Sequence, residues 1–129
     1  MSKSQKILIT GVAGFLGSHL AERLTNMNHS VVGIDNMIGG YRDNVPENIE
    51  FHEIDCCDLN KVKEVMKGVD VVYHCAATAH EGLSVFSPYE ISKNNYLASI
   101  SIFTAAVNEK VKRIIFCSSM ARYGDQKTP

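Results

Sequence analysis

The sequence lacks a strong excess of charge of either sign. Its 13 basic and 14 acidic residues leave a formal net charge of -1. The only basic cluster, Lys110, Lys112 and Arg113, is short and typical of a solvated helix end and strand entry. A surface that binds nucleic acid or a membrane needs a concentrated positive field. We therefore expect neither nucleic acid nor a membrane as a partner.

Long apolar runs and metal-binding patterns are also missing. No stretch approaches the roughly 20 apolar residues that span a bilayer, and the polar residues 1–6 do not resemble a signal peptide. The cysteines, Cys56, Cys57, Cys75 and Cys117, form no Cys-x-x-Cys pair, and the histidines show no ligand spacing with them. We expect a cytoplasmic protein with reduced, buried thiols and no metal site.

What the sequence does contain is a glycine-rich segment, residues 10–17, directly after an apolar run. Gly11 lets the chain turn sharply out of a strand, Gly14 lets the backbone approach a pyrophosphate, and Gly17 lets a helix pack close to the strand. The first helix amides can then bind anionic oxygens. The spacing is one residue longer than the commonest dinucleotide fingerprint, and a glycine-rich turn without a ligand stays an alternative.

An acidic residue closes the next apolar run. Asp35 lies 18 residues after Gly17, near the distance at which a carboxylate binds the adenosine ribose of a dinucleotide. A carboxylate there repels a 2′-phosphate, and Asn36 and Met37 bring no positive charge, although Arg42 is not far along the chain. The pattern favours NAD over NADP; the alternative is a polar residue that ends a strand.

Strands and helices alternate in the prediction. Strands are expected at about residues 6–10, 30–35, 49–54, 69–75 and 113–118, and helices at about 14–28, after 58 and from 88 to 109. Near-continuous apolar strands predict a parallel sheet covered by helices on both faces. Right-handed crossovers predict the strand order 3-2-1-4-5. The fold class is therefore α/β, a single Rossmann-type domain over residues 1–129.

Three finer expectations follow from these elements. The first helix is predicted to bury Leu16, Leu20, Leu24 and Met27. The polar segment 78–88 is predicted to be a loop that faces the substrate. The carboxyl ends of the strands meet at one edge of the sheet, and this edge is expected to collect Gly11, Asp35, Ala76 and Ser118.

Several motifs match one family in the same order. They are residues 10–20, Asp35-Asn36, Asp58-Leu59, His74-Cys75-Ala76-Ala77, Asn95, and Ser118-Ser119 followed by Tyr123-Gly124. Together they resemble the N-terminal part of an extended short-chain dehydrogenase/reductase, and more narrowly the NAD-dependent epimerase/dehydratase family of nucleotide-sugar enzymes. The resemblance implies a Rossmann domain that is truncated before the sixth strand and the substrate domain.

The resemblance also implies a set of cofactor-binding residues. These are Gly11, Gly14, Phe15, Leu16, Gly17, Asp35, Asn36, Asp58, Leu59, Cys75, Ala76, Ala77 and Asn95. In this set the amides at 15 and 16 meet the pyrophosphate, the pair 35–36 holds the adenine ribose, and the pair 58–59 borders the adenine. Residues 75–77 form a wall of small side chains beside NAD, and Asn95 stabilises the backbone of the active site. Asp58 also suits the N-cap of the next helix, and both roles can hold.

By the same resemblance Ser119 is the catalytic hydroxyl, which hydrogen-bonds the sugar oxygen during hydride transfer; a serine in a local turn is the alternative. Tyr123 and Lys127 have the Tyr-x-x-x-Lys spacing of the family's base pair, but residues 124–129 do not look like a helix start. We expect the true pair to lie downstream, and the chain alone not to turn over substrate.

The reaction is inferred from what stands between Ser119 and Tyr123. Met120-Ala121-Arg122 offers no carboxylate, which a dehydratase needs to expel water. The expected enzyme is thus a 4-epimerase that transiently oxidises C4 of a UDP- or GDP-sugar, the parent enzyme being a homodimer. A dehydratase or reductase of the same family and a non-catalytic NAD-binding module are the alternatives.

Overall fold

A five-stranded parallel sheet forms the centre of the computed structural model, which describes residues 4–125. Its strands are β1 (Lys6–Thr10), β2 (Ser30–Asp35), β3 (Glu50–Glu53), β4 (Val71–His74) and β5 (Arg113–Phe116). Their order, β3-β2-β1-β4-β5, confirms the predicted one. Residue Thr10 is in register with Ile34 on one side and His74 on the other, so the carboxyl ends of the three central strands meet.

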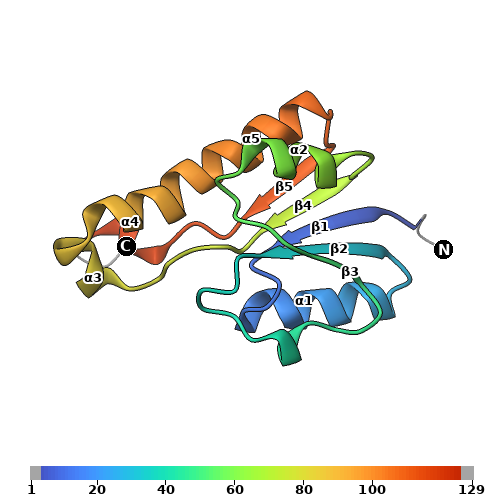
Figure 1. Ribbon diagram of the computed structural model, residues 1–129, viewed down its shortest axis with the longest axis horizontal. Coiled ribbons are helices and arrows are strands. Elements are labelled where there is room, and N and C mark those ends of the chain that lie inside the picture. The colour runs from blue at the N-terminus through green and yellow to red at the C-terminus, as the bar shows by residue number, and fades with distance from the viewer. Residues whose placement is uncertain (1–3, 126–129) are drawn as a thin grey trace.

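Helices cover both faces of the sheet (Figure 1). Helix α1 (Phe15–Asn26) lies on one face, and α2 (Leu59–Met66) and α5 (Ala98–Asn108) lie on the other. Alternate residues of β1 point to opposite sides: Leu8 belongs to the core under α2 and α5, and Ile7 and Ile9 to the core under α1. Burial on both faces explains why the central strands are almost continuously apolar.

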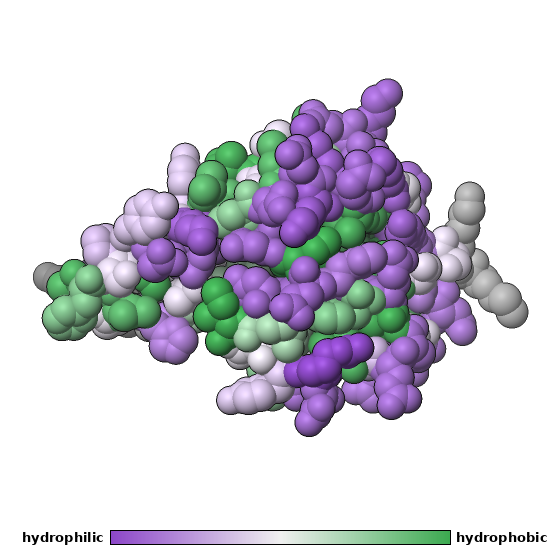
Figure 2. All heavy atoms as spheres, in the orientation of Figure 1, coloured by the Kyte–Doolittle hydropathy of each residue, from purple (hydrophilic) through white to green (hydrophobic). Residues whose placement is uncertain are grey.

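Beyond the carboxyl ends of the strands the chain forms further short helices (Figure 1). They are α3 (Glu81–Phe86), α4 (Pro88–Ser92) and a π-helical segment (Lys93–Leu97) that runs into α5. Two 3-10 turns, Arg42–Asn44 and Met120–Tyr123, complete the elements. Figure 2 shows apolar residues gathered at the end of the molecule that α3 and α4 form.

The predicted loop at 78–88 is wrong, because α3 occupies most of it. The polar residues and Gly82 suggested a loop, but six residues suffice for a short helix that ends at Ser87. Pro88 then starts α4 at its first position, where a missing backbone N–H costs nothing.

The predicted buried face of α1 is also partly wrong. Leu24 is buried, whereas Leu16 and Met27 are each 49% exposed. The buried residues of α1 are Gly17, Ser18, Ala21 and Leu24, and the predicted Leu20 is partly buried against the same core. The start of α1 lies so close to the strands that only a small side chain fits, and the bulky neighbour at 16 is turned outward.

The thiols are less buried than predicted. All four cysteines are free, but only Cys56 is buried; Cys57 and Cys75 are partly buried and Cys117 is exposed. Cys117 follows β5, an edge strand whose last residue, Phe116, is itself 53% exposed. Within residues 4–125 no helix combines the length and the apolar character needed to cross a membrane.

Candidate cofactor and substrate site

The glycine loop joins β1 to α1 under tight steric limits. Gly11 has a φ of +71°, and a Cβ there would lie 2.9 Å from the backbone of Ala76. A Cβ on Gly17 would lie 2.1 Å from the carbonyl oxygen of Gly11. Gly14 precedes α1 and lines a cavity. A Cβ on Gly14 would lie 3.3 Å from the same carbonyl oxygen. The turn and the close helix packing that the sequence predicted are therefore both present.

Asp35, the last residue of β2, holds this loop in place. Its side chain accepts a hydrogen bond from the amide of Ala13 at 3.0 Å and one from the amide of Met37 at 2.9 Å. The residue is only 8% exposed, yet it also lines the cavity. Each carboxylate oxygen has a second lone pair, so Asp35 can support the loop and still accept from a hydroxyl in the cavity.

The cavity lies along the carboxyl edge of the sheet and has a volume of about 440 Å³. Such a volume is in the range of small-molecule sites. Two carboxylates, Asp35 and Asp55, belong to its lining, and no lysine or arginine of the described chain does. Arg42, the one nearby cation noted in the sequence, stacks over the ring of Phe51 at 4.7 Å instead. The electrostatics of this cavity therefore oppose an additional phosphate.

The pair predicted to border the adenine does not reach the cavity. Asp58 caps α2, with Oδ1 accepting from the amide of Lys61 at 3.2 Å, and Leu59 packs against the core. Asp55 and Cys56 line the cavity in their place. They follow β3 almost directly, as Asp35 ends β2, so the position of the strand end was the signal that could have found them.

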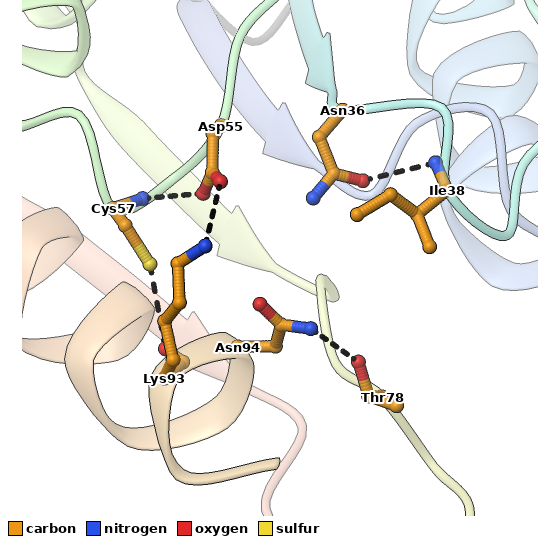
Figure 3. Close-up of polar contacts among 7 residues, drawn as sticks. All are labelled: Asn36, Ile38, Asp55, Cys57, Thr78, Lys93 and Asn94. Carbon is orange, nitrogen blue, oxygen red and sulfur yellow. Dashed lines mark hydrogen bonds and ion pairs between the residues drawn. The ribbon is translucent and has the colours of Figure 1, made fainter. Parts of the chain in front are cut away.

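Asp55 is connected to the far wall of the cavity (Figure 3). One of its oxygens accepts from the amide of Cys57 at 2.8 Å, and the other lies 3.9 Å from Nζ of Lys93. The thiol of Cys57 in turn donates to the carbonyl of Lys93 at 3.4 Å. Burial, followed by the charge of Asp55, raises the pKa of the neighbouring Cys56 thiol to about 12. These contacts fasten the turn after β3 to the π-helical segment.

Small residues at the end of β4 separate two cavities. Cys75, Ala76 and Ala77 line the first cavity and also a second one of about 490 Å³. Ser118 and Ser119 line the second cavity. Ser118 has a φ of 55°, a left-handed conformation that is uncommon for residues other than glycine and that often marks functional sites. Ser119 caps the following 3-10 turn, its hydroxyl accepting from the amide of Ala121 at 3.1 Å.

The buried His74 supports this wall by linking Thr10, at the end of β1, to Ser99 of α5 through hydrogen bonds. Thr10 Oγ1 accepts from the amides of Cys75 and Ala76, at 3.2 and 3.0 Å, so its proton is directed to His74 Nδ1 at 2.7 Å. His74 Nε2 then donates to the Ser99 hydroxyl at 2.9 Å, which donates to the carbonyl of residue 95 at 2.6 Å. Burial lowers the pKa of His74 to about 4. The imidazole is therefore neutral and carries its proton on Nε2.

Asn95, a site residue implied by the resemblance, holds the backbone of Thr78, which follows the wall at 75–77. Its Oδ1 accepts from the amide of Thr78 at 2.7 Å, and its Nδ2 donates to the carbonyl of Thr78 at 3.1 Å. Asn94 Nδ2 donates to the Thr78 hydroxyl at 3.2 Å (Figure 3). Both asparagines belong to the π-helical segment, a type of helix that is frequent at functional sites.

The other residues that the sequence analysis named lie in different surroundings. Asn36 lines the first cavity. The Phe15 side chain is 82% exposed and points to solvent. The predicted contact of residues 15 and 16 with a pyrophosphate therefore concerns their backbone amides and stays a prediction. Arg122 lies over the ring of Tyr123 at 5.6 Å and lines the second cavity. Lys127 lies outside the described residues.

His80 belongs to the segment 78–88, which the sequence predicted to face the substrate. It lines both cavities, as do Thr78 and Ala79. Ser84 of α3 lines the second cavity. A ligand that extends from one cavity into the other therefore passes over this segment.

Comparison with known proteins identifies the class of molecule. The fold is a Rossmann-type α/β domain, and residues 7–129 match the model of the NAD dependent epimerase/dehydratase family. The chain belongs to this family.

Individual relatives agree with that placement. The chain is 35% identical over 128 residues to UDP-N-acetyl-alpha-D-glucosaminuronate decarboxylase from Bacillus cytotoxicus, covering 97% of the chain and 40% of that relative. It is 34% identical to UDP-glucose 4-epimerase from Streptomyces lividans, over 95% of the chain and 38% of that relative. The crystal structure of UDP-glucose 4-epimerase from Brucella ovis in complex with NAD superposes with a TM-score of 0.91 at 32% identity, covering 97% of the chain and 39% of that structure. The chain thus spans about 40% of the length of these proteins.

Proposed function

We propose that this chain is the NAD-binding part of a UDP-sugar 4-epimerase. One observation carries the cofactor assignment: Gly14, which has no side chain, and the buried carboxylate of Asp35 line one cavity that holds no lysine or arginine among its described residues. A pyrophosphate needs the first, and an unphosphorylated adenosine ribose fits the second. The family membership and the relative that was solved with NAD support the same assignment.

The residues of the site divide the work along the cavity. Asp35 accepts from ribose hydroxyls, Asn36 lies beside it, and Asp55 and Cys56 border the adenine. The free amides at the start of α1 face the pyrophosphate, aided by the helix dipole. When bound, NAD supplies a hydride acceptor for transient oxidation of the sugar. Across the wall at 75–77, the Ser119 hydroxyl hydrogen-bonds the sugar oxygen whose carbon is oxidised.

The 4-epimerase is favoured over the decarboxylase and dehydratase alternatives by the turn after Ser119. This turn, Met120–Tyr123, contains no carboxylate, whereas expulsion of water needs an acid. Decarboxylation stays a second candidate reaction, because one relative at 35% identity is a decarboxylase. UDP is favoured as the carrier nucleotide because both curated relatives are named for UDP-sugars; a GDP-sugar is the other outcome of the substrate test.

Calorimetric titration of the chain with NAD⁺ and NADP⁺ tests the cofactor assignment. We expect NAD⁺ to bind at least about tenfold more tightly than NADP⁺ because Asp35 repels the 2′-phosphate. Gly14→Ala should weaken NAD⁺ binding, since the new methyl group would crowd the Gly11 carbonyl oxygen at 3.3 Å and displace the loop that faces the pyrophosphate. The matched control is Gly82→Ala, where a Cβ meets no atom within 4 Å, and its affinity should equal that of the unchanged chain. Equal binding of both dinucleotides would contradict the assignment.

The reaction itself is tested by product analysis. The chain, and any longer protein that carries it, is incubated with NAD⁺ and UDP-glucose, a UDP-glucuronate derivative or a GDP-sugar, and the products are separated by chromatography. A change of configuration at C4 supports the epimerase, and release of carbon dioxide supports the decarboxylase. Ser119→Ala should lower turnover while NAD⁺ affinity is unchanged; binding of NAD⁺ without any product in any protein would favour a non-catalytic module.

Two further expectations accompany the proposal. The homodimer stays a prediction, and the surface it would bury includes exposed apolar side chains on α4, the π-helical segment and α5, namely Tyr89, Tyr96, Leu97, Ile100 and Val107. Sedimentation equilibrium measures the oligomeric state.

The four free thiols suit a reducing compartment, which supports the cytoplasmic location that the sequence led us to expect.

A further inference from the structure

Two cysteines stand side by side at the carboxyl edge of the sheet. Cys75 and Cys117 each lie one residue beyond the last paired positions of β4 and β5, where His74 is in register with Phe116. Neighbouring strands are about 4.8 Å apart, within the range of about 4.4–6.8 Å between Cα atoms that a disulfide spans. Cys117 is near enough to Cys75 to contribute to the raised pKa of the Cys75 thiol, which agrees with the neighbouring positions of the two residues in the register.

The environments of the two thiols differ. Cys117 is exposed, whereas Cys75 is partly buried. Burial, followed by the adjacent Cys117, raises the pKa of the Cys75 thiol to about 12, so its thiolate is scarce at neutral pH. Cys117 is therefore the thiol that a reagent in solution meets, and Cys75 is the neighbour that can respond. The other two cysteines are arranged differently, since Cys56 is buried and the Cys57 thiol donates a hydrogen bond to the Lys93 carbonyl.

We propose that Cys75 and Cys117 form a redox-responsive dithiol on the wall of the site, which a hydroperoxide closes to a disulfide. In the first step the Cys117 thiolate attacks the O–O bond, which gives a sulfenic acid at Cys117 and releases water or an alcohol. In the second step the Cys75 sulfur attacks the Cys117 sulfur. The proton of Cys75 and the sulfenic hydroxyl leave together as water. The two thiols lose two electrons, and the hydroperoxide gains them.

The position of the pair connects oxidation to occupancy of the site. Cys75 lines both cavities, and Cys117 lines the second together with Ser118 and Ser119. A ligand that lies across residues 75–77 covers the approach to the dithiol. This step rests on the proposed function, in which the ligand is NAD⁺. The disulfide form of the pair is therefore expected mainly in chains whose cofactor site is empty.

The test is peptide mapping of the chain after exposure to hydrogen peroxide and alkylation of the remaining thiols, without reduction. We expect one intramolecular cross-linked peptide that contains Cys75 and Cys117. Cys117→Ser should abolish it, and Cys75→Ser should leave a sulfenic acid at Cys117 that dimedone traps. Cys57→Ser is the matched control, because Cys57 lines neither cavity and serine can still donate to Lys93; its cross-link should form at the unchanged rate.

Two outcomes would overturn the proposal. One is full alkylation of Cys75 and Cys117 after peroxide treatment; the other is a cross-link that joins different cysteines or different chains. Saturating NAD⁺, with binding verified by calorimetry, should slow cross-linking at least about tenfold. If the free chain cross-links and bound NAD⁺ leaves the rate unchanged, shielding is overturned while the proposed cofactor stands. If NAD⁺ does not bind at all, the proposed function fails and the dithiol is judged on the free chain alone.

Discussion

Asn95 pairs with both backbone polar groups of Thr78, accepting from its amide at 2.7 Å and donating to its carbonyl at 3.1 Å. A primary amide matches a backbone amide in this way because it presents one donor and one acceptor side by side. The pair therefore replaces the strand partner that Thr78 would have if β4 continued. It holds the segment that both cavities share in one conformation.

The first prediction concerns this pair. Asn95→Ala leaves the N–H and C=O of Thr78 without these partners, and we expect the free energy of unfolding to fall by about 1–3 kcal/mol. Asn94→Ala removes one bond to the Thr78 hydroxyl and should cost less. Urea unfolding measures both, and hydrogen exchange at the Thr78 amide should accelerate in the Asn95 variant. Equal effects of the two substitutions would contradict the role assigned to Asn95.

The second prediction concerns the close approach of α1 to the glycine loop. In Gly17→Ala the new Cβ would lie 2.1 Å from the Gly11 carbonyl oxygen, so the helix has to move away from the strand. We expect a loss of about 3 kcal/mol or more in the free energy of unfolding. The control, Gly82→Ala in α3, adds a methyl group in open space and should be neutral or stabilising by up to about 1 kcal/mol. Thermal unfolding compares the two; similar melting temperatures would refute the packing argument.

The third prediction concerns the carboxylate at the end of β2. In Asp35→Asn only one oxygen remains to accept from the amides of Ala13 and Met37, and the new NH₂ group faces the other amide. We expect the free energy of unfolding to fall by about 1–2 kcal/mol, and the preference for NAD⁺ over NADP⁺ to shrink because the repelling charge is gone. Asp43→Asn, at an exposed position, is the control and should change neither quantity. Calorimetry and urea unfolding provide the two measurements.

The fourth prediction concerns the pH dependence of stability. In the folded chain the pKa of His74 is about 4, below the value of 6.5 for a free histidine, so between these pH values the unfolded chain binds a proton that the folded chain does not. The stability due to neutral His74 is complete above pH 6.5 and is lost as the pH falls toward 4, by up to about 3 kcal/mol in total.

Urea unfolding at several pH values measures this slope, and NMR titration of the imidazole measures the pKa directly. His74→Asn should remove the contribution of this residue to the slope, whereas His52→Asn, a substitution at a partly exposed position, should retain it. A titration midpoint near 6.5 for His74 in the folded chain would refute the prediction.

Much of the fold follows from the sequence because its signals are local. The bounds of β1 and β2 and the strand order follow from apolar runs, turn residues and the right-handed crossover rule. The errors arose where tertiary packing decides. Leu16 and Met27 have helical spacing with Leu24, but the contact at Gly17 sets which face of α1 meets the sheet.

The site was predictable where a residue ends a strand, as at Gly11, Asp35 and Ala76, because parallel strands share one edge. The adenine pair predicted from the motif match, Asp58 and Leu59, lies outside the lining of the first cavity, whereas Asp55 and Cys56 line it. The hydrogen-bond chain through His74 was hidden because its partners, Thr10 and Ser99, are far apart in sequence. No local sequence pattern predicts the contact between Thr10 and His74, which are 64 positions apart.

The π-helical segment Lys93–Leu97 makes this part of the chain sensitive to length. A π-turn holds one residue more than an α-turn, and here the extra residue lets Lys93 reach toward Asp55 while Asn94 and Asn95 both reach Thr78. Removing a single residue would turn this segment into a regular α-helix, in which these three side chains would point in other directions. The number of residues between α4 and α5, and not only the identity of their side chains, is therefore fixed by the walls that this segment joins.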